Sequence, residues 1–362
     1  MTISEQNILS LLSQTIDPTI GKDYVTTKTI HNIRIEQNNV WLDVELGYPA
    51  QRIKNDIEQQ IINALKTLPG IGNIHVYVRS KIIPHSVQQG VKLIPGIKNI
   101  IAVASGKGGV GKSATAVNIA LALAAEGAVV GILDADIYGP SQPQMLGITQ
   151  HPDSLDGKTM EPVQAHGIQA ISIGLLIDAE TPMVWRGPMV TQALQQLLYD
   201  TNWKDVDYLI VDLPPGTGDI QLTLAQKIPV TGAVIVTTPQ DIALLDARKG
   251  LKMFEKVGIP ILGIVENMST HICSNCGHTE PIFGTGGGEK MSRDYNVELL
   301  GSLPLDIKIR EHTDTGKPSV VAEPDGKIAA AYRLIARRIA AKVAESAEDL
   351  SELFAKIITE DN

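Results

Sequence analysis

The chain has 362 residues, of which 43% are hydrophobic, and it carries a formal net charge of −9 at pH 7. This length allows a large core and favours two domains, whereas the acidic balance argues against a broad basic surface for nucleic acid. The chain has no apolar run near the roughly 18 residues of a membrane-spanning helix, no signal peptide pattern at its N-terminus and only two cysteines, so we expect a soluble cytoplasmic protein without a disulfide framework.

The first 80 residues predict a small α+β domain with the order α-β-β-α-β. A helix is expected at residues 3–13, and two β-rich segments flank the polar residues 37–39, which indicates a hairpin. A third strand is expected in NIHVYVRS, and residues 81–97, with two prolines and two glycines but no clear period, are interpreted as a linker. The helix before that strand is predicted by four apolar residues on one face: Ile53, Ile57, Ile61 and Leu65.

Residues 98–362 predict a larger α/β domain. Short, continuously apolar segments such as NIIAVAS, DYLIVD and GAVIVTT alternate with helix-forming segments. Strands of this kind belong to a parallel sheet that helices cover on both faces. Residues 325–345 predict a further helix packed on this domain, because five large side chains recur at helical spacing: Ile328, Tyr332, Ile335, Ile339 and Val343.

The segment GKGGVGKS, residues 106–113, follows an apolar strand and precedes a helix-forming run. It matches the P-loop pattern G-x-x-x-x-G-K-[ST] in the required context. The glycines allow backbone amides to point at phosphate oxygens, Lys112 would reach the β- and γ-phosphates, and the Ser113 hydroxyl would bind Mg²⁺. We therefore expect a P-loop NTPase with a mostly parallel sheet flanked by helices, and its predicted nucleotide-binding loop comprises Gly106, Lys107, Gly108, Gly109, Val110, Gly111, Lys112 and Ser113.

Lys107 stands directly after the first glycine of this loop, where it adds little within one chain to what Lys112 supplies. A lysine at this position resembles the signature lysine of the deviant Walker A family, which includes nitrogenase iron protein, ParA and MinD. In that family the lysine reaches across a dimer to the partner's nucleotide. The resemblance therefore implies a homodimer with two ATP molecules, in which Lys107 and Lys112 are both catalytic.

Three aspartates and one asparagine follow the strands of the predicted sheet. Asp134 and Asp136 come after AVVGIL, and Asp212 ends DYLIVD. An acid at the carboxyl end of a strand beside a P-loop usually binds a water of Mg²⁺, and we assign this role to Asp212. The resemblance implies that Asp136 positions the attacking water, that Asp134 lies near Mg²⁺, and that Asn267 contacts the nucleotide base.

The two cysteines, Cys273 and Cys276, lie together in HICSNCGHTE, and four interpretations are open. A thioredoxin-like redox pair should open a helix, whereas this pair follows a strand and a turn. His271 and His278 could complete a zinc site within one chain, or two chains could share a zinc ion. Finally, a two-fold axis turns one pair into four thiolates, the set that holds a [4Fe–4S] cluster.

Several motifs together resemble the Mrp/ApbC-type iron–sulfur cluster carrier proteins. They cover residues 95–345 and are GKGGVGKS, DADIYGPS, WRGPM, DLPPGTGD, VENMS and CSNCG followed by IFGTGGGEK. Residues 1–80 are similar to the iron–sulfur-assembly domain fused to many bacterial members, although they contain no cysteine. The resemblance implies an ATPase that binds a labile [4Fe–4S] cluster through Cys273 and Cys276 at a homodimer interface and transfers it to apo iron–sulfur proteins, with assembly scaffolds as further partners.

A positioning ATPase like ParA or MinD, with zinc at the cysteine pair, is the alternative function. Membrane targeting of the MinD kind needs a basic amphipathic helix at the C-terminus, whereas residues 344–362 are net acidic. We therefore expect neither a membrane nor a nucleic acid as a partner. The alternative also leaves the cysteine pair without a role in positioning.

Overall fold

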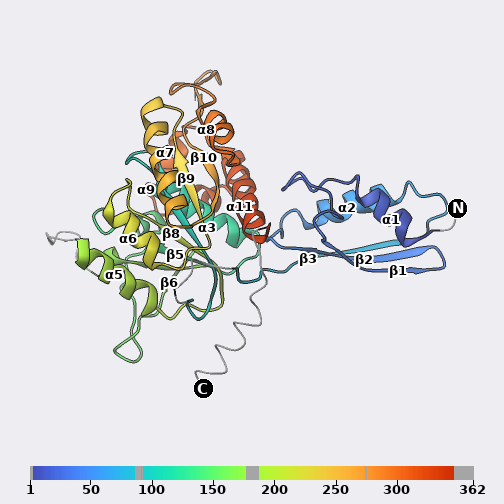
Figure 1. The fold of residues 1–362 in the computed structure, drawn as a ribbon, viewed down its shortest axis with the longest axis horizontal. Coiled ribbons are helices and arrows are strands. Elements are labelled where there is room, and N and C mark those ends of the chain that lie inside the picture. The colour runs from blue at the N-terminus through green and yellow to red at the C-terminus, as the bar shows by residue number, and fades with distance from the viewer. Residues whose placement is uncertain (1–2, 86–90, 92, 177–186, 274, 346–362) are drawn as a thin grey trace.

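The computed structural model describes residues 3–85, 91, 93–176, 187–273 and 275–345. They form a three-stranded sheet near the N-terminus and an eight-stranded sheet in the rest of the chain (Figure 1). Residues Trp185 and Arg186 of the WRGPM motif lie outside the described part. Among the described helices, none combines the length and the apolar character that crossing a membrane requires.

The N-terminal elements follow the predicted order α-β-β-α-β. Strands β1 and β2 form an antiparallel hairpin, and β2 also pairs with β3 in parallel. The two loop residues of the hairpin, Gln37 and Asn38, have positive φ angles of 47° and 75°, which is the turn geometry that fits the twist of paired strands. The elements are α1 (Glu5–Leu12), β1 (Ile30–Glu36), β2 (Asn39–Leu46), α2 (Lys54–Leu65) and β3 (Ile74–Ser80).

Helix α2 closes the core of this small sheet with the predicted apolar face. Ile57, Ile61 and Leu65 are buried, whereas Ile53 stands at the N-cap and is only half-buried. The spacing of three and four residues places these side chains above one another on the side of the helix that meets the sheet. The sequence periodicity therefore identified the buried face correctly.

The large sheet has the strand order β13-β10-β9-β4-β8-β5-β7-β6. Each neighbouring pair is parallel except β6 with β7 at one edge, which confirms the expected mostly parallel sheet. Strands β5, β7, β8 and β9 are buried along their whole length, as strands with both faces covered must be. The strands are β4 (Ile97–Ala104), β5 (Val130–Asp134), β6 (Val163–Ala165), β7 (Ile168–Ser172), β8 (Val206–Asp212), β9 (Gly232–Thr237), β10 (Ile261–Glu266) and β13 (Leu299–Ser302).

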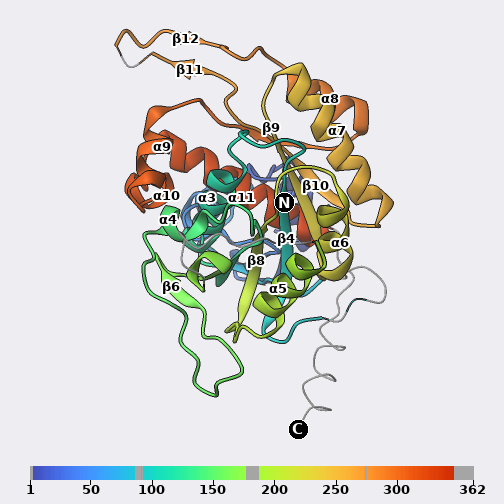
Figure 2. The same ribbon diagram turned by 90° about the vertical axis from the view of Figure 1, so that its left-hand side faces the viewer.

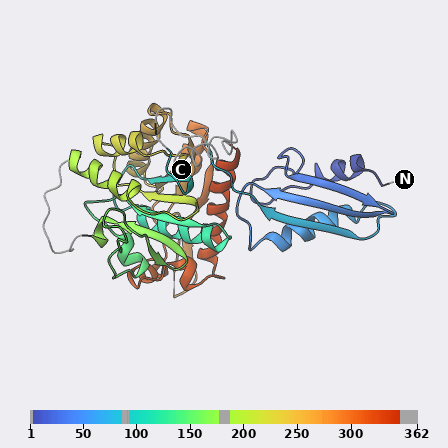
Figure 3. The same ribbon diagram turned by 90° about the horizontal axis from the view of Figure 1, so that it is seen from below.

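Helices cover both faces of the large sheet (Figure 3). Helices α3 and α11 contribute to one hydrophobic core, and α5, α6 and α7 contribute to the other. The predicted C-terminal helix is confirmed as α11, which buries Tyr332, Ile335, Ile339 and Val343. The helices are α3 (Lys112–Ala125), α4 (Gln142–Leu146), α5 (Gly187–Tyr199), α6 (Asp219–Lys227), α7 (Asp241–Lys256), α8 (Gly287–Tyr295), α9 (Ile307–Asp314), α10 (Ser319–Ala322) and α11 (Lys327–Glu345), with a 3₁₀ turn at Ile173–Leu175.

A buried carboxylate, Glu126, joins the two sheets' surroundings at the end of α3. Its side chain accepts a hydrogen bond from the backbone N–H of Arg52 (3.0 Å) and pairs with the guanidinium of Arg337 on α11. Its backbone carbonyl accepts from the N–H of Gln51 (3.1 Å). A buried charge is stable only when it is paired and hydrogen-bonded, so this residue ties the segment before α2 to both α3 and α11.

Part of the predicted linker also packs on the large sheet. The imidazole Nδ1 of His85 lies 2.7 Å from Oδ1 of Asn99 in β4, and the Asn99 amide donates to the carbonyl oxygen of Ile83 (3.0 Å). His85 and Asn99 are both buried. Residues 83–85 therefore support β4, although they lie on the N-terminal side of the predicted linker.

The division into residues 1–80 and 98–362 stays a prediction, and two truncated chains test it. Removing residues 1–80 should leave a folded remainder, because residues 83–85 still support β4. Removing residues 1–95 should lower the free energy of unfolding by a further amount of roughly 1–3 kcal/mol, because Oδ1 of Asn99 loses a buried partner. Urea denaturation of both chains measures the difference.

Equal stability of the two truncated chains would contradict the supporting role of residues 83–85. A remainder that fails to fold after removal of residues 1–80 would contradict the domain boundary itself.

Candidate functional site

The candidate phosphate site lies where three parallel strands end at the same edge of the large sheet. β4 leads into residues 105–111, and β5 and β8 end in Asp134 and Asp212, which are direct partners in the strand register. Because parallel strands present their carboxyl ends together, the topology brings the loops that follow them to one place. Here a hollow of about 250 Å³ is lined by Lys107, Lys112, Ser113 and Asp136, among other residues.

The glycines of residues 106–111 allow contacts that a side chain would prevent. A Cβ atom on Gly106 would lie 2.1 Å from the backbone of Asp246 in α7. Gly109 and Gly111 have φ angles of +82° and +80°, a region that favours glycine, and a Cβ on Gly111 would lie 2.2 Å from Nδ2 of Asn267. The loop can therefore turn tightly between α7 and the end of β10 before α3 begins at Lys112.

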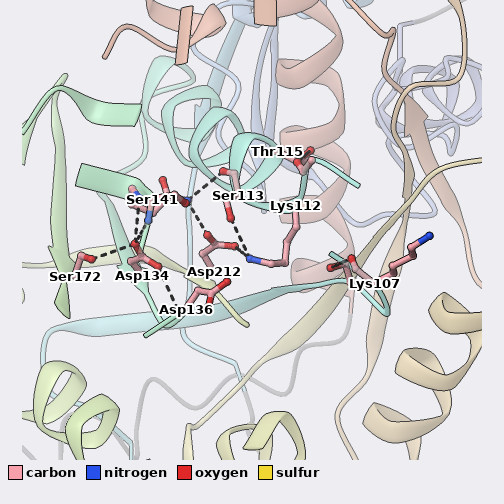
Figure 4. A network of polar contacts seen from close by, with 12 residues as sticks. Lys107, Lys112, Ser113, Thr115, Asp134, Asp136, Ser141, Ser172 and Asp212 are labelled. Atoms are coloured by element: carbon pink, nitrogen blue, oxygen red, sulfur yellow. Dashed lines mark hydrogen bonds and ion pairs between the residues drawn. The ribbon is translucent and has the colours of Figure 1, made fainter. Parts of the chain in front are cut away.

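The amino group of Lys112 is buried in the wall of this hollow. Its Nζ atom forms an ion pair with Oδ1 of Asp212, which is fully buried, and donates to the Ser113 hydroxyl oxygen (3.1 Å). Figure 4 shows Lys112, Ser113 and Asp212 directed toward one another. The predicted phosphate-binding lysine, the predicted Mg²⁺-binding hydroxyl and the carboxylate from β8 are thus in direct contact.

Asp134 holds the segment that follows β5. Its Oδ1 accepts from the N–H of Asp136 (3.2 Å), and its Oδ2 accepts from the N–H groups of Ser141 and Gln142 (2.9 and 3.0 Å) and from the Ser172 hydroxyl (3.1 Å). Burial and, secondly, the neighbouring Asp212 raise the pKa of Asp134 to about 7. The contacts make Asp134 a clamp on residues 136–142, while its proximity to Mg²⁺ stays a prediction.

The other two charged residues predicted for catalysis differ in exposure. Asp136 is half-buried at the hollow, and burial raises the pKa of its carboxyl, an effect that Lys112 partly opposes. Lys107 is exposed, and its side chain points away from the labelled carboxylates in Figure 4. Lys107 therefore does not take part in the network around Lys112 and Asp212.

Asn267 connects the phosphate loop to the end of β10. Its side-chain amide donates to the carbonyl oxygen of Val110 (2.9 Å), and its backbone N–H donates to Thr237 at the end of β9 (2.7 Å). The sequence resemblance predicted a contact with a nucleotide base, whereas the structure places the amide against the loop backbone. Met268 follows with a φ angle of 57°, an uncommon conformation for a residue other than glycine.

From Met268 the backbone runs directly to the cysteine pair. Hydrogen bonds between this segment and residues 303–305 hold it in place, from the N–H of Ser269 to Leu303 (3.0 Å) and from the N–H of Leu305 to Thr270 (2.8 Å). Strands β11 (His271–Ile272) and β12 (Thr279–Glu280) then form a short antiparallel hairpin that projects from the body of the large sheet (Figure 2).

The cysteine pair occupies the turn of this hairpin. Cys273 is half-buried and Cys276 is exposed. The backbone N–H groups of Cys276 and Asn275, and the Cys276 thiol, donate to the Cys273 sulfur, and they hold the pKa of Cys273 below its usual range. A lowered pKa favours the thiolate, which is the form that binds metals and reacts.

Within one chain, these thiols have no histidine or carboxylate neighbours arranged for a metal. Among the residues that the structure describes, no group of three or more His, Cys, Asp and Glu side chains is placed to hold an ion. His271 directs Nδ1 to the carbonyl oxygen of Leu305 (3.1 Å), and His278 is exposed. This arrangement argues against a zinc site completed by the two histidines of the same chain.

Two residues of the phosphate site were not identified from the sequence. Ser172 ends β7, the strand beside β5, and reaches Asp134. Gln142 begins α4 and donates through Nε2 to Oδ2 of Asp212 (2.9 Å) and to the carbonyl oxygen of Ser113 (3.1 Å). The position of Ser172 at the carboxyl end of a strand was a usable signal, whereas no sequence pattern marked Gln142.

Comparisons with known proteins agree with the two parts of the fold. A ParA family model described as NUBPL iron-transfer P-loop NTPase matches residues 96–340, and a model described as iron–sulfur cluster assembly protein matches residues 5–76. The chain is 53% identical over 327 residues to the iron–sulfur cluster carrier protein of Escherichia coli K12, covering 90% of this chain and 89% of that protein. It is 48% identical to the mouse iron–sulfur cluster transfer protein NUBPL over 71% of this chain and 81% of that one.

Solved structures show the same nucleotide-binding fold. A nucleotide-binding protein from Archaeoglobus fulgidus in complex with ADP superimposes with a TM-score of 0.55 and 34% identity, covering 72% of this chain and 93% of that chain. The cell division ATPase MinD of Pyrococcus furiosus gives a TM-score of 0.50 and 25% identity, with coverage of 67% and 98%. Both likenesses leave about a third of this chain uncovered.

The ion pair of Lys112 with Asp212 generates a prediction about stability in the absence of nucleotide. Lys112→Met should lower the free energy of unfolding by roughly 3–5 kcal/mol, because it leaves a fully buried carboxylate without its cation. Adding Asp212→Asn to this variant should recover most of the loss, because the remaining group is neutral. Urea denaturation of the nucleotide-free proteins measures both effects.

The matched control is Lys107→Met, which removes an exposed lysine from the same loop and should change stability by no more than about 0.5 kcal/mol. A Lys112→Met protein as stable as this control would show that the buried ion pair contributes nothing.

Proposed function

This chain belongs to the NUBPL-type iron-transfer family of P-loop NTPases, and from that membership we propose that it hydrolyses ATP and carries an iron–sulfur cluster that it transfers to apo-proteins. The family model covers residues 96–340, and relatives at about 50% identity are named as cluster carriers. The observation that carries the proposal is a pair of thiols on a projecting hairpin whose base is tied to a phosphate loop. We further propose that the cargo is a labile [4Fe–4S] cluster bound between two copies of the chain.

The donor count supports a cluster shared by two chains. One chain offers two thiols, and its neighbouring histidines are not arranged to complete a metal site. A two-fold axis at the hairpin would bring two pairs together, and four thiolates are the usual ligand set of a [4Fe–4S] cluster. The exposure of Cys276 suits a carrier, because an acceptor protein must reach the cluster to take it.

The residues around the P-loop fit a Mg²⁺ nucleotide. Mg²⁺ prefers oxygen ligands such as hydroxyl and carboxylate groups, and Ser113, Asp134 and Asp212 offer these within one network. The buried Oε1 atom of Gln142 has no hydrogen-bond partner among the described residues, as expected for a site that accepts further polar groups. When bound, Mg²⁺ would neutralise phosphate charge.

The chain's own residues have separate roles in the proposed hydrolysis. Lys112 would leave Asp212 to contact the phosphates, which exchanges one anionic partner for another. Asp136, half-buried at the hollow, would orient the attacking water. Lys107 is exposed and points away from the phosphate network of its own chain, which is the placement that a residue acting on a partner's nucleotide needs.

Asn267 provides the route by which nucleotide occupancy would affect the cluster. Its amide binds the phosphate loop at Val110, and six residues further along the same backbone stands Cys273. Between them, hydrogen bonds to residues 303–305 hold the segment, so a displacement of the loop would pass to the hairpin rather than dissipate. This is a coupling through one continuous backbone segment.

A positioning ATPase is the less favoured function. The MinD structure shares the nucleotide-binding fold at 25% identity, but fold alone does not imply function. The cysteine hairpin and the N-terminal match to an iron–sulfur cluster assembly model both favour a carrier. Apo-proteins that require clusters are therefore the proposed partners, and a cytoplasmic location is proposed from the bacterial relatives.

Anaerobic reconstitution with iron and sulfide tests the cluster site. The wild-type dimer should bind about four irons and four sulfides and absorb broadly near 400 nm. Cys273→Ser and Cys276→Ser should each abolish stable binding, because the two-fold axis removes two thiolates at once and serine oxygen is a poor ligand for this soft site. Nucleotide binding should survive in both variants.

His271→Ala and His278→Ala are the matched controls from the same hairpin, and their cluster content should stay close to that of the wild type. A purified wild-type protein that binds one zinc ion per chain and no sulfide would refute the carrier proposal.

A mixing experiment tests whether Lys107 acts on the partner's nucleotide. Lys107→Ala and Asp136→Asn should each be almost inactive in ATP hydrolysis. In a mixed dimer, the site with an intact Asp136 receives Lys107 from the other chain, so an equal mixture should regain about a quarter of wild-type activity if chains exchange randomly. No recovery after demonstrated exchange would show that Lys107 acts within its own chain.

A further inference from the structure

Gln142 links three segments of the phosphate site that are far apart in the sequence. It is 1% exposed, and its Nε2 donates to Oδ2 of Asp212 (2.9 Å) and to the carbonyl oxygen of Ser113 (3.1 Å). Its backbone N–H donates to Oδ2 of Asp134 (3.0 Å). One residue therefore contacts the carboxylates at the ends of β5 and β8 and the first turn of α3.

The orientation of the Gln142 amide follows from its partners. Both atoms that face Nε2 are oxygens that can only accept, so the nitrogen must be on that side. The other amide atom, Oε1, is bonded to the same carbon and is buried without a hydrogen-bond partner among the described residues. A buried acceptor of this kind, beside a carboxylate, usually serves a bound ion, water or ligand.

The two oxygens of Asp212 are held by different residues. Lys112 contacts Oδ1, and Gln142 contacts Oδ2. If Lys112 turns to a phosphate group, Oδ1 is released, whereas the Gln142 contact remains and prevents rotation of the carboxylate. A hydrogen bond to a charged group is stronger than one between neutral groups, so this contact is suited to a positioning role.

We propose that Gln142 is a positioning residue that holds Asp212 for Mg²⁺ and links that site to the segment carrying Asp136. This inference rests on the proposed nucleotide function. The chemistry at this position is specific. Glutamate would place a third carboxylate beside Asp134 and Asp212, methionine would leave Asp212 Oδ2 without its donor, and asparagine is one methylene too short to reach both acceptors.

The link to Asp136 follows from the backbone contact. Asp134 accepts from the N–H groups of Asp136, Ser141 and Gln142, so both ends of residues 136–142 are fixed to the end of β5. The side chain of Gln142 then ties the same segment to Asp212. A displacement of residues 136–142 therefore changes the position of the carboxylate that faces Mg²⁺.

The test measures nucleotide binding at controlled free Mg²⁺, with a fluorescent ADP derivative so that hydrolysis does not interfere. Gln142→Met should raise the free Mg²⁺ concentration needed for half-maximal enhancement of ADP binding by roughly tenfold, the effect of losing one hydrogen bond to a charged group. ADP affinity in the presence of EDTA should change by less than about twofold. Gln142→Asn should show the same defect.

Gln144→Met is the matched control, because Gln144 is an exposed residue of the same helix α4, and it should behave as the wild type. In an Asp212→Asn background, Gln142→Met should have little further effect on the Mg²⁺ requirement, because the two residues act through one contact.

Three outcomes are distinguishable. Equal losses of ADP affinity with and without Mg²⁺ in the Gln142 variants would overturn the positioning role and leave Gln142 as a packing residue. Wild-type Mg²⁺ dependence in a folded Gln142→Asn protein would overturn it as well. If the wild-type protein itself bound no nucleotide, the proposed function would fail before this inference is reached.

Discussion

The structure depends on the burial of charge at one edge of a parallel sheet. Asp134 and Asp212 are side by side at the ends of β5 and β8, and both are fully buried. Two carboxylates in this position repel each other and lose their hydration, which is why the pKa of Asp134 is raised. The surrounding donors offset this cost: Lys112 and Gln142 for Asp212, and Ser172 with backbone N–H groups for Asp134. A site that must bind phosphate and a cation is thus held ready by interactions that would be too costly elsewhere.

Helix α3 transmits this arrangement to the rest of the molecule. Its first residue is Lys112, it is almost entirely buried, and it is followed by Glu126, which binds the backbone before α2 and the guanidinium of Arg337 on α11. The nucleotide loop and the N-terminal sheet therefore lie at opposite ends of one rigid element. The largest hollow of the described residues, about 560 Å³, is also at this junction, between the N-terminal sheet and the end of α11, and not at the P-loop.

The two candidate sites use opposite physical strategies. The phosphate site is buried and crowded, so that glycines are required where Asp246 and Asn267 approach the loop. The cysteine hairpin is exposed and held by few contacts beyond its own turn and residues 303–305. Rigidity orients phosphate-binding groups before the ligand arrives, whereas a transferred cluster must be reachable from outside. Asn267 stands between them, with its side chain on the loop and its backbone leading into the hairpin.

Local patterns in the sequence were enough to determine the α-β-β-α-β order of the first 80 residues, the buried face of α2, the mostly parallel sheet and the position of the P-loop. These features depend on residues within a few positions of one another, so periodicity and motif spacing report them directly. The tertiary structure alone decided that Asn267 contacts Val110, that Gln142 holds Asp212, and that Glu126 joins the N-terminal segment to α3 and α11. Those partners are 157, 70 and 74 positions apart, and a polar residue has no local pattern that names a distant partner. Only the packing of the sheet brings such residues within hydrogen-bonding distance, and burial then makes their pairing obligatory.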